Sequence, residues 1–238
     1  SEIMENKKSI GLPGGPNEFL KDITQYISVE GYKRYSEDVN NPYNIIESSN
    51  ITMEDDDEGP YVDITGTVDD VRQEPVIEID GVVHRDDPIF HALIPGEAEH
   101  KTLMGLPRAP TIKSAVNEVC ECIDVHMTEG GCGWLAAVVK IRKKNPEDSM
   151  NAIHAALAGH RSMKMVTVVD EDIDIGNPVR VEWAMVTRWQ PDKDTLILSN
   201  QKGSSLDPSR DNDGLTAKVG FDATLPWGVD HEGFKSVQ

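Results

Sequence analysis

Two carboxylates flank a glycine–proline pair in the sequence Glu58-Gly59-Pro60-Tyr61-Val62-Asp63. On a regular strand, residues five apart point to opposite faces, because the side-chain period is two. Gly59 and Pro60 interrupt that period, so Glu58 and Asp63 can converge on one cavity. Paired carboxylates in a closed site separate a proton donor from its charge partner. A turn that enters a strand explains the same residues without any catalysis, and taken alone it is the simpler interpretation.

A second acidic cluster follows an apolar run, Met165–Val169, and has the sequence Asp170-Glu171-Asp172-Ile173-Asp174. Clustered carboxylates can hold Mg²⁺ or Ca²⁺. The cluster lacks the glycine and the terminal glutamate of an EF-hand loop. We therefore favour a structural role, in which acidic side chains at a strand end cap the following turn and helix.

Four soft ligands also lie close together: Cys120, Cys122, His126 and Cys132. Such a set can bind zinc tetrahedrally. However, Cys-x-Cys is not a usual zinc spacing, and Cys120 falls on the apolar face of a predicted helix. Buried free thiols are the favoured interpretation, with a small zinc-binding scaffold as the alternative.

The overall charge excludes several classes of partner. The 238 residues carry 23 Lys and Arg against 42 Asp and Glu, a formal net charge of −19. A protein that binds nucleic acid or an anionic membrane surface needs clustered positive charge, so this balance argues against both partners. No apolar run approaches the length of a membrane span. Three cysteines in one short stretch are too few for a secreted disulfide scaffold, which favours the cytosol.

The first hundred residues change from polar to β-rich. A polar segment covers residues 1–43, with an amphipathic helix predicted over 17–29, and the acidic run 53–58 is expected to begin as a solvated loop. Apolar side chains then alternate at a period of two, which predicts strands over 61–67, 76–84 and 89–94. We expect an antiparallel sheet or part of a barrel here.

The pattern from residue 101 onward is mixed. Helical spacing covers 111–119, strands are predicted over 123–127 and 134–141, and a helix opens at Asn145-Pro146 and ends at Gly159. Strand 165–169 follows. Residues 177–188 fit either a helix opened by Asn177-Pro178 or a strand, and residues 201–238 are expected to be mostly loop. Helix-strand-strand-helix-strand predicts a compact α/β sandwich.

Several segments in this order resemble the UbiD family of prenylated-flavin-dependent decarboxylases. They are Glu58-Gly59-Pro60-Tyr61-Val62-Asp63-Ile64-Thr65-Gly66-Thr67, His84-Arg85-Asp86-Asp87-Pro88-Ile89-Phe90, Gly130-Gly131-Cys132-Gly133, Val168-Val169-Asp170-Glu171-Asp172-Ile173-Asp174, Val181-Glu182-Trp183-Ala184-Met185-Val186-Thr187-Arg188, Ser205-Leu206-Asp207-Pro208-Ser209 and Lys218-Val219-Gly220-Phe221-Asp222-Ala223-Thr224. The resemblance covers only the carboxyl-terminal half of a typical family member. It implies an α/β (α+β) fold: the end of a flavin-binding split β-barrel over 44–100, a compact α/β domain over 101–226 and a tail over 227–238.

The resemblance also implies roles for the two carboxylates. Asp63 matches the family's proton donor, and Glu58 matches the residue that orients and charge-balances a catalytic arginine. That arginine, and the ligands of the divalent metal that grips the flavin phosphate, belong to the amino-terminal half of the family pattern and have no match in residues 1–43. The implied cofactors are prenylated FMN, a divalent metal (Mn) and K, held mostly outside this chain.

The expected reaction is the decarboxylation, or the reverse carboxylation, of an unsaturated or aromatic carboxylic acid. Loss of CO₂ leaves an electron pair that no side chain can accept, so an organic cofactor is needed. We expect the chain to form a homo-oligomer, or a hetero-oligomer with an amino-terminal UbiD-like subunit or domain. The alternative is a non-catalytic assembly or regulatory subunit that keeps the fold.

Overall fold

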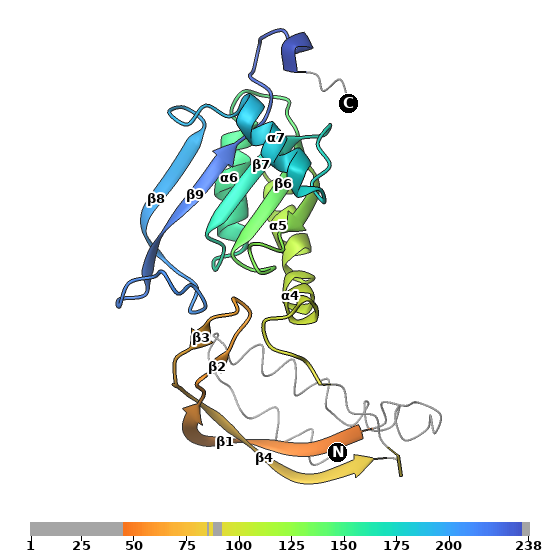
Figure 1. The fold of residues 1–238 in the computed structure, drawn as a ribbon, viewed down its shortest axis with the longest axis vertical. Coiled ribbons are helices and arrows are strands. Elements are labelled where there is room, and N and C mark those ends of the chain that lie inside the picture. Colours follow the sequence, from red (N-terminus) through yellow and green to blue (C-terminus); the bar gives the residue numbers. More distant parts are fainter. Residues whose placement is uncertain (1–44, 85, 88–91, 235–238) are drawn as a thin grey trace. The chain divides into compact units, whose positions relative to one another are not determined.

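The computed structural model describes residues 45–84, 86–87 and 92–234, which form two compact units (Figure 1). Of the described residues, the first unit comprises those up to Gly59 and those between Val71 and Ala92, and the second comprises Pro60–Asp70 and those from Leu93 onward. The predicted helix over 17–29 lies outside the described residues. We call the first the hairpin unit and the second the sheet unit.

The hairpin unit is a long antiparallel pair of strands, β1 (Ile45–Glu58) and β4 (Arg72–His84). The predicted strand over 76–84 is confirmed, and it begins four residues earlier. The loop predicted at the start of the acidic run is wrong, because the run lies in β1. Strand pairing tolerates these negative charges because the side chains are exposed and stay hydrated, namely those of Asp55, Asp56, Asp57 and Glu58.

Two short strands, β2 (Tyr61–Val62) and β3 (Val68–Asp69), begin the sheet unit as a small hairpin. The prediction of one strand over 61–67 is therefore right only for its first two residues. Of the strand predicted over 89–94, residues 89–91 lie outside the described part of the chain, and residues 92–94 are not in a strand.

A five-stranded mixed sheet is the centre of the sheet unit, with the order β5-β6-β7-β9-β8. Strands β6, β7 and β9 are parallel, and β5 and β8 pair antiparallel at the two edges. The strand bounds are β5 Glu121–Met127, β6 Ala136–Arg142, β7 Met165–Asp170, β8 Thr195–Lys202 and β9 Leu215–Asp222. This confirms the mixed α/β fold, and the described residues form no closed barrel.

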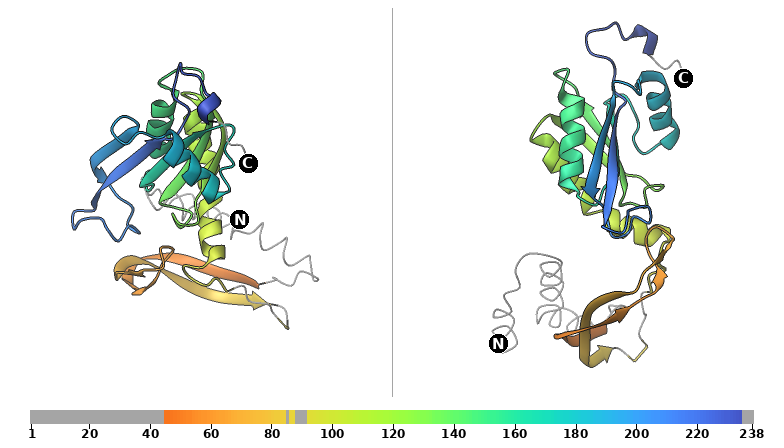
Figure 2. Two further views of the ribbon diagram at one scale, coloured as in Figure 1. Left: turned by 45° about the horizontal axis from the view of Figure 1, so that its top comes forward. Right: turned by 90° about the vertical axis from the view of Figure 1, so that its left-hand side faces the viewer.

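Helices cover both faces of this sheet (Figure 2). Their bounds are α4 Ala98–Gly105, α5 Arg108–Asn117, α6 Asp148–Gly159 and α7 Pro178–Arg188, with a short 3₁₀ turn, η1, at Glu232–Phe234. Helices α5 and α6 pack on one face around Ile112, Val116 and Ile153, and α7 packs on the other around Val181 and Ala184. No helix among the described residues is both long and apolar enough to cross a membrane.

The predicted helices and strands between 111 and 169 are confirmed, with ends that move by up to three residues. Helix α6 begins at Asp148 rather than at Asn145-Pro146, because the Asp148 carboxylate accepts the backbone N–H groups of Lys144 (2.7 Å) and Asn145 (2.9 Å). Over 177–188 the helix is correct and the strand is wrong, since the Asn177 side chain caps α7 by accepting from Val179 N at 3.0 Å.

The expectation of loops over 201–238 is wrong in its central part. Strand β9 lies inside the sheet between β7 and β8. Its sequence conceals this position, because Lys218 and Gly220 are buried although neither is a typical core residue. Helix α4 and residues 195–200 of strand β8 carried no prediction, and the last two residues of β8 lie in the segment predicted as loop.

Candidate functional site

Asp63 lies in the tight turn between β2 and β3. Its N–H donates to Thr67 O (3.1 Å), its carbonyl accepts from Gly66 N (2.8 Å), and its Oδ1 accepts from Ile64 N (2.5 Å). The side chain is half-buried, and its other carboxylate oxygen has no hydrogen-bond partner among the described residues. The backbone thus fixes Asp63 and leaves one oxygen available to a ligand.

Two neighbours anchor this turn in the sheet unit. Ile64 is fully buried, which ties the turn to the core. Gly96 has a φ of +73°, and a Cβ there would lie 3.1 Å from the carbonyl oxygen of Asp63. A larger residue at position 96 would be strained and would press on the Asp63 backbone.

A cavity of about 660 Å³ opens beside Asp63. One wall is the β2–β3 hairpin and the other is the segment 202–214, which brings Lys202 and Arg210 to the same space. This volume lies in the range of small-molecule sites. Asp63 therefore borders a space that can hold a ligand, within a single unit of the molecule.

The loop that forms the second wall is held by buried polar contacts around Asp207. Lys164 Nζ donates to both oxygens of Asp207 (3.1 and 2.8 Å), and Ser209 Oγ donates to Asp207 Oδ1 (2.8 Å). Burial alone raises the pKa of Asp207, but these hydrogen bonds outweigh it and hold the pKa below its ordinary value. Sequence analysis missed this role, since Lys164 and Asp207 are 43 residues apart.

Glu58 ends β1 in the hairpin unit, opposite Arg72 in the register, and its side chain is exposed. Asp63 belongs to the sheet unit, so each predicted catalytic carboxylate is described in its own unit. Their convergence on one cavity stays a prediction.

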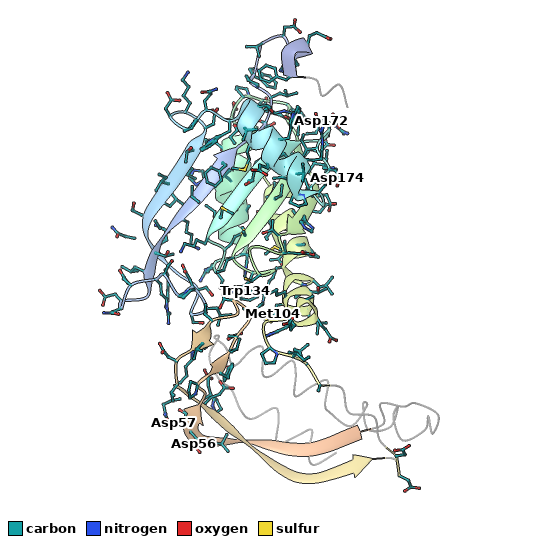
Figure 3. The ribbon with its side chains drawn as sticks, viewed as in Figure 1. Asp56, Asp57, Met104, Trp134, Asp172 and Asp174 are labelled. Carbon is teal, nitrogen blue, oxygen red and sulfur yellow. The ribbon has the colours of Figure 1, made fainter. Side chains whose placement is uncertain are left out.

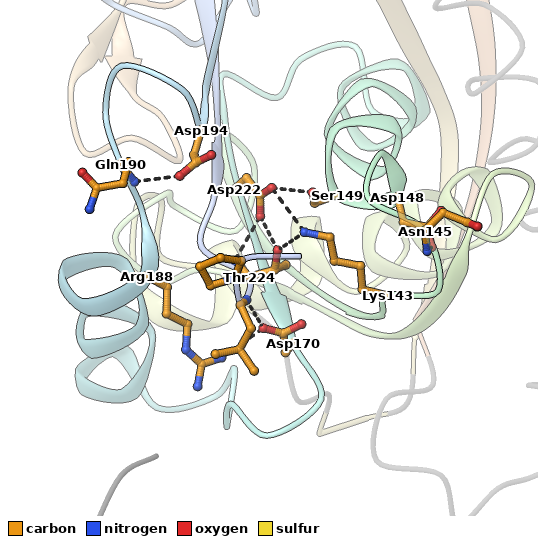
Figure 4. A network of polar contacts seen from close by, with 12 residues as sticks. Lys143, Asn145, Asp148, Ser149, Asp170, Arg188, Gln190, Asp194, Asp222 and Thr224 are labelled. Carbon is orange, nitrogen blue, oxygen red and sulfur yellow. Dashed lines mark hydrogen bonds and ion pairs between the residues drawn. The ribbon is translucent and has the colours of Figure 1, made fainter. Parts of the chain in front are cut away.

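The carboxyl ends of the parallel strands carry a network of paired charges (Figure 4). Arg188, only 1% exposed at its side chain, binds Asp170 Oδ2 (3.1 Å) and Asp172 Oδ2 (2.6 Å). Burial raises the pKa of Asp170, whereas the hydrogen bond from Arg188 lowers that of Asp172. The acidic cluster after β7 thus pairs an arginine in the last turn of α7, which is a structural role. The predicted capping of the following helix is wrong in its detail, because Asn177 caps α7.

A second part of the same network surrounds Asp222 at the end of β9. Its carboxylate accepts from Thr224 Oγ1 (2.6 Å) and from Ser149, and Lys143 lies 3.9 Å away. Lys143 also donates to Thr224 Oγ1 at 2.8 Å. These partners satisfy one another, which is typical of a structural network and not of an open ligand site.

The metal hypotheses gain no support from the described residues, which contain no group of three or more His, Cys, Asp and Glu side chains placed to hold a metal ion. All three cysteines are free thiols. Burial raises the pKa of Cys120 and of Cys122 to about 11, so both stay protonated at neutral pH.

Comparison with known families identifies both halves of the described chain. Residues 101–223 match the model described as the 3-octaprenyl-4-hydroxybenzoate carboxy-lyase C-terminal domain. Residues 36–98 match the model described as the Rift-related domain of the same enzyme family.

Curated relatives share a high sequence identity over part of their length. Anhydromevalonate phosphate decarboxylase of Methanocaldococcus jannaschii is 55% identical over 177 residues, which are 74% of this chain and 42% of that protein. The protein of the same name from Archaeoglobus fulgidus is 48% identical over 193 residues, 81% of this chain and 44% of its own length. The chain thus spans less than half the length of these relatives.

Solved structures show the same fold. The UbiD-class enzyme HmfF from Pelotomaculum thermopropionicum, in complex with FMN, matches with a TM-score of 0.77 and 35% identity over 82% of this chain and 44% of that one. The open form of vanillic acid decarboxylase from Sedimentibacter hydroxybenzoicus matches with a TM-score of 0.69 and 27% identity, over 82% of this chain and 43% of that one.

Proposed function

Because the chain belongs to the UbiD family of carboxy-lyases, we propose that it supplies the carboxyl-terminal part of a decarboxylase that acts on a small unsaturated acid. An amino-terminal UbiD-like part, either a subunit or a domain, completes the site and carries the catalytic arginine. The curated relatives support this proposal, since the chain spans 42% and 44% of the length of two of them. Residues 44–100 and 101–226 are then the two functional segments of the chain, and its unpaired thiols suit a reducing compartment such as the cytosol.

The names of the curated relatives narrow the substrate. Their substrate, anhydromevalonate phosphate, is an acid that also carries a phosphate group. We propose the same class of substrate here: an unsaturated acid with a phosphate monoester at some distance from the carboxylate that is lost.

The observation that carries the proposal is the position of Asp63, fixed by its turn and bordering the 660 Å³ cavity. Decarboxylation breaks the bond between a carbon atom and the carboxylate carbon, and CO₂ leaves without the bonding electrons. That carbon must then receive a proton. We assign the transfer to the Asp63 carboxyl group, which solvent reprotonates before the next turnover.

Prenylated FMN, when bound, supplies the electron sink that this reaction needs. The cavity beside Asp63 has the volume for a small substrate, with Lys202 and Arg210 as its only cations among several aspartates. The described residues lack a set of metal ligands for a flavin phosphate. We therefore propose that Mn, K and most contacts to the flavin come from the amino-terminal part.

The test is Asp63→Asn in the chain co-produced with its amino-terminal part and the cofactor. We expect decarboxylation to fall by about 100-fold or more, the range that a positioned proton donor contributes. Exchange of solvent deuterium into the product should fall in parallel. The matched control is Asp70→Asn, an exposed carboxylate on the same cavity, which should stay within a few-fold of wild type.

Two results would contradict the proposal. Normal turnover by the Asp63→Asn variant would remove Asp63 from the reaction. A colourless complex that decarboxylates nothing, under every condition of co-production, would favour the alternative of a non-catalytic assembly or regulatory subunit.

A further inference from the structure

Arg108, the first residue of α5, has an unusual environment for a partly buried guanidinium. Its Cζ lies 4.6 Å from the centre of the Trp134 ring. Its Nε is buried without a hydrogen-bond partner, as is that of Arg188, but unlike Arg188 it forms no ion pair within the described ranges. A guanidinium has five N–H donors, and no hydrogen bond to a described residue uses those of Arg108.

Lys218 of β9 is a second cation near the same place. It is only 6% exposed, and its ammonium group donates to the backbone carbonyl of Arg161. No carboxylate of the described residues pairs with it, and burial lowers its pKa. A buried ammonium that lacks an anion is costly, which favours a bound anion in the working protein.

Trp134 and His160 connect the two cations. The His160 ring packs edge-on against Trp134, with ring centres 4.5 Å apart, and His160 Nε2 donates to the Trp134 carbonyl at 3.0 Å. Lys218 reaches the same place because the carbonyl that its ammonium group binds belongs to Arg161, the residue after His160. Burial lowers the pKa of His160 to about 4, and the nearby charges of Arg108 and Lys218 lower it in the same direction.

The chain holds Trp134 in place through the glycine-rich turn before β6. Gly133 has a φ of +65°, and a Cβ there would lie 2.3 Å from the backbone oxygen of Lys101 in α4. Only glycine permits this contact. The indole N–H of Trp134 donates to Ser204 Oγ at 3.1 Å, which also restrains the ring. Figure 3 shows Trp134 beside α4, at the end of the sheet away from Asp172.

Comparison with a second arginine shows that stacking on a tryptophan does not by itself explain why Arg108 has no acidic partner. Arg180 also lies 4.6 Å from a tryptophan ring, that of Trp183. Arg180, however, interacts electrostatically with a carboxylate, since its charge helps to lower the pKa of Asp172. The two stacks share their geometry and differ in whether an acid is present.

We propose that Arg108 and Lys218, arranged around Trp134, form the site that binds the phosphate group of the substrate. The proposal rests on the proposed function for the identity of the anion. A phosphate monoester is mostly a dianion at neutral pH, which matches two cations that have no carboxylate of their own. The forked guanidinium can bind two phosphate oxygens at once, and the compact ammonium can bind as a point charge.

The decisive experiment titrates inorganic phosphate into the full chain, with its amino-terminal part present, and measures the dissociation constant by calorimetry. We expect Arg108→Met to weaken binding by about tenfold or more, the loss of a charge-assisted bidentate contact. Arg108→Lys keeps the charge and should recover part of the affinity. Arg180→Met, the matched stack, should bind phosphate as the wild type does.

Kinetics give a second measurement. With the phosphorylated acid, Arg108→Met should raise KM by about tenfold while kcat changes little, because the lost contact is distant from the reacting carbon. With the same acid lacking its phosphate, wild type and variant should have equal kcat/KM.

The outcomes separate the two proposals. If Arg108→Met is folded and binds inorganic phosphate as tightly as the wild type, the phosphate site is wrong, whatever the enzyme decarboxylates. A wild-type protein that binds no phosphate at millimolar concentration also overturns it. If the variant loses phosphate binding but no acid is decarboxylated by any form, the phosphate site stands and the proposed reaction fails.

Discussion

The two ends of the five-stranded sheet place cations in opposite electrostatic settings. At the carboxyl ends of the parallel strands, Arg188 is buried against two carboxylates, Asp170 and Asp172. Near the amino ends of β6 and β7, Arg108 and Lys218 are at least partly buried with no carboxylate partner among the described residues.

This difference separates structural charges from charges that await a ligand. A chain with a net charge of −19 has carboxylates in excess, so a cation without one is not explained by a shortage of acids. We call the end with Arg188, Asp170 and Asp172 the paired end, and the end with Arg108 and Lys218 the unpaired end. The paired end contributes to the stability of the fold. At the unpaired end neither cation has a carboxylate partner among the described residues, and we propose that an anion from outside the chain supplies the missing charge.

The largest effect is expected when the ion pairs of Arg188 at the paired end are removed. Arg188→Met should lower the free energy of unfolding by about 3 kcal/mol, because it leaves Asp170 without its counter-charge in a buried site. Asp172, with 52% of its side chain exposed, can be hydrated and adds less to the loss. The measurement is urea denaturation of wild type and variant at neutral pH.

Arg188→Lys is the control for this change. An ammonium keeps the charge but cannot reach both carboxylates as the planar guanidinium does, so an intermediate loss is expected. Equal unfolding midpoints for wild type and Arg188→Met would show that the paired end is not a stabilising network.

The sequence predicts the paired end better than the unpaired one. The order of helices and strands between 111 and 169 follows from local patterns, such as helical spacing in α5 and the continuous apolar run of β7. Over 177–188 the cap at Asn177 indicated a helix, but the alternation of apolar residues left a strand open. The acidic cluster after β7 was predicted to be structural because it directly follows a buried strand. Its partner, Arg188, lies only 16 to 18 residues further on.

The parts that sequence reasoning missed depend on contacts between distant residues. Strand β9 has no apolar run, and it is recognisable as an interior strand only once β7 and β8 lie beside it. Asp63 was predicted from its motif, but the wall opposite comes from segment 202–214. The position of Arg108 depends on Trp134, 26 positions later, and its lack of a carboxylate partner is visible only in three dimensions.

A smaller effect concerns His160, whose ring packs against Trp134 at the unpaired end. Burial and the charge of Arg108 lower its pKa from 6.5 to about 4. Between these values the unfolded chain binds a proton that the folded protein does not, so stability is lost as the pH falls from about 6.5 to about 4. The loss from this one group is at most about 3 kcal/mol. Urea denaturation across this pH range measures it.

The control is His160→Phe, which keeps an aromatic ring against Trp134 but cannot titrate. Its stability should depend less steeply on pH over the same range, even if its stability at neutral pH is lower. An unchanged pH dependence would mean that His160 titrates normally in the folded protein, and that the cations do not act on it.

The smallest expected effect on stability is that of Arg108→Met. The variant loses the cation–π contact with Trp134, which contributes about 0.5–1 kcal/mol, but it also removes a partly buried charge with no counter-ion. These terms oppose each other, so the free energy of unfolding should change by less than about 1 kcal/mol, well below the loss in Arg188→Met. Without the Arg108 charge the pKa of His160 should rise, and the loss of stability in acid should become smaller. A loss as large as that of Arg188→Met would show that Arg108 stabilises the fold as a paired cation does, and the contrast between the two ends of the sheet would disappear.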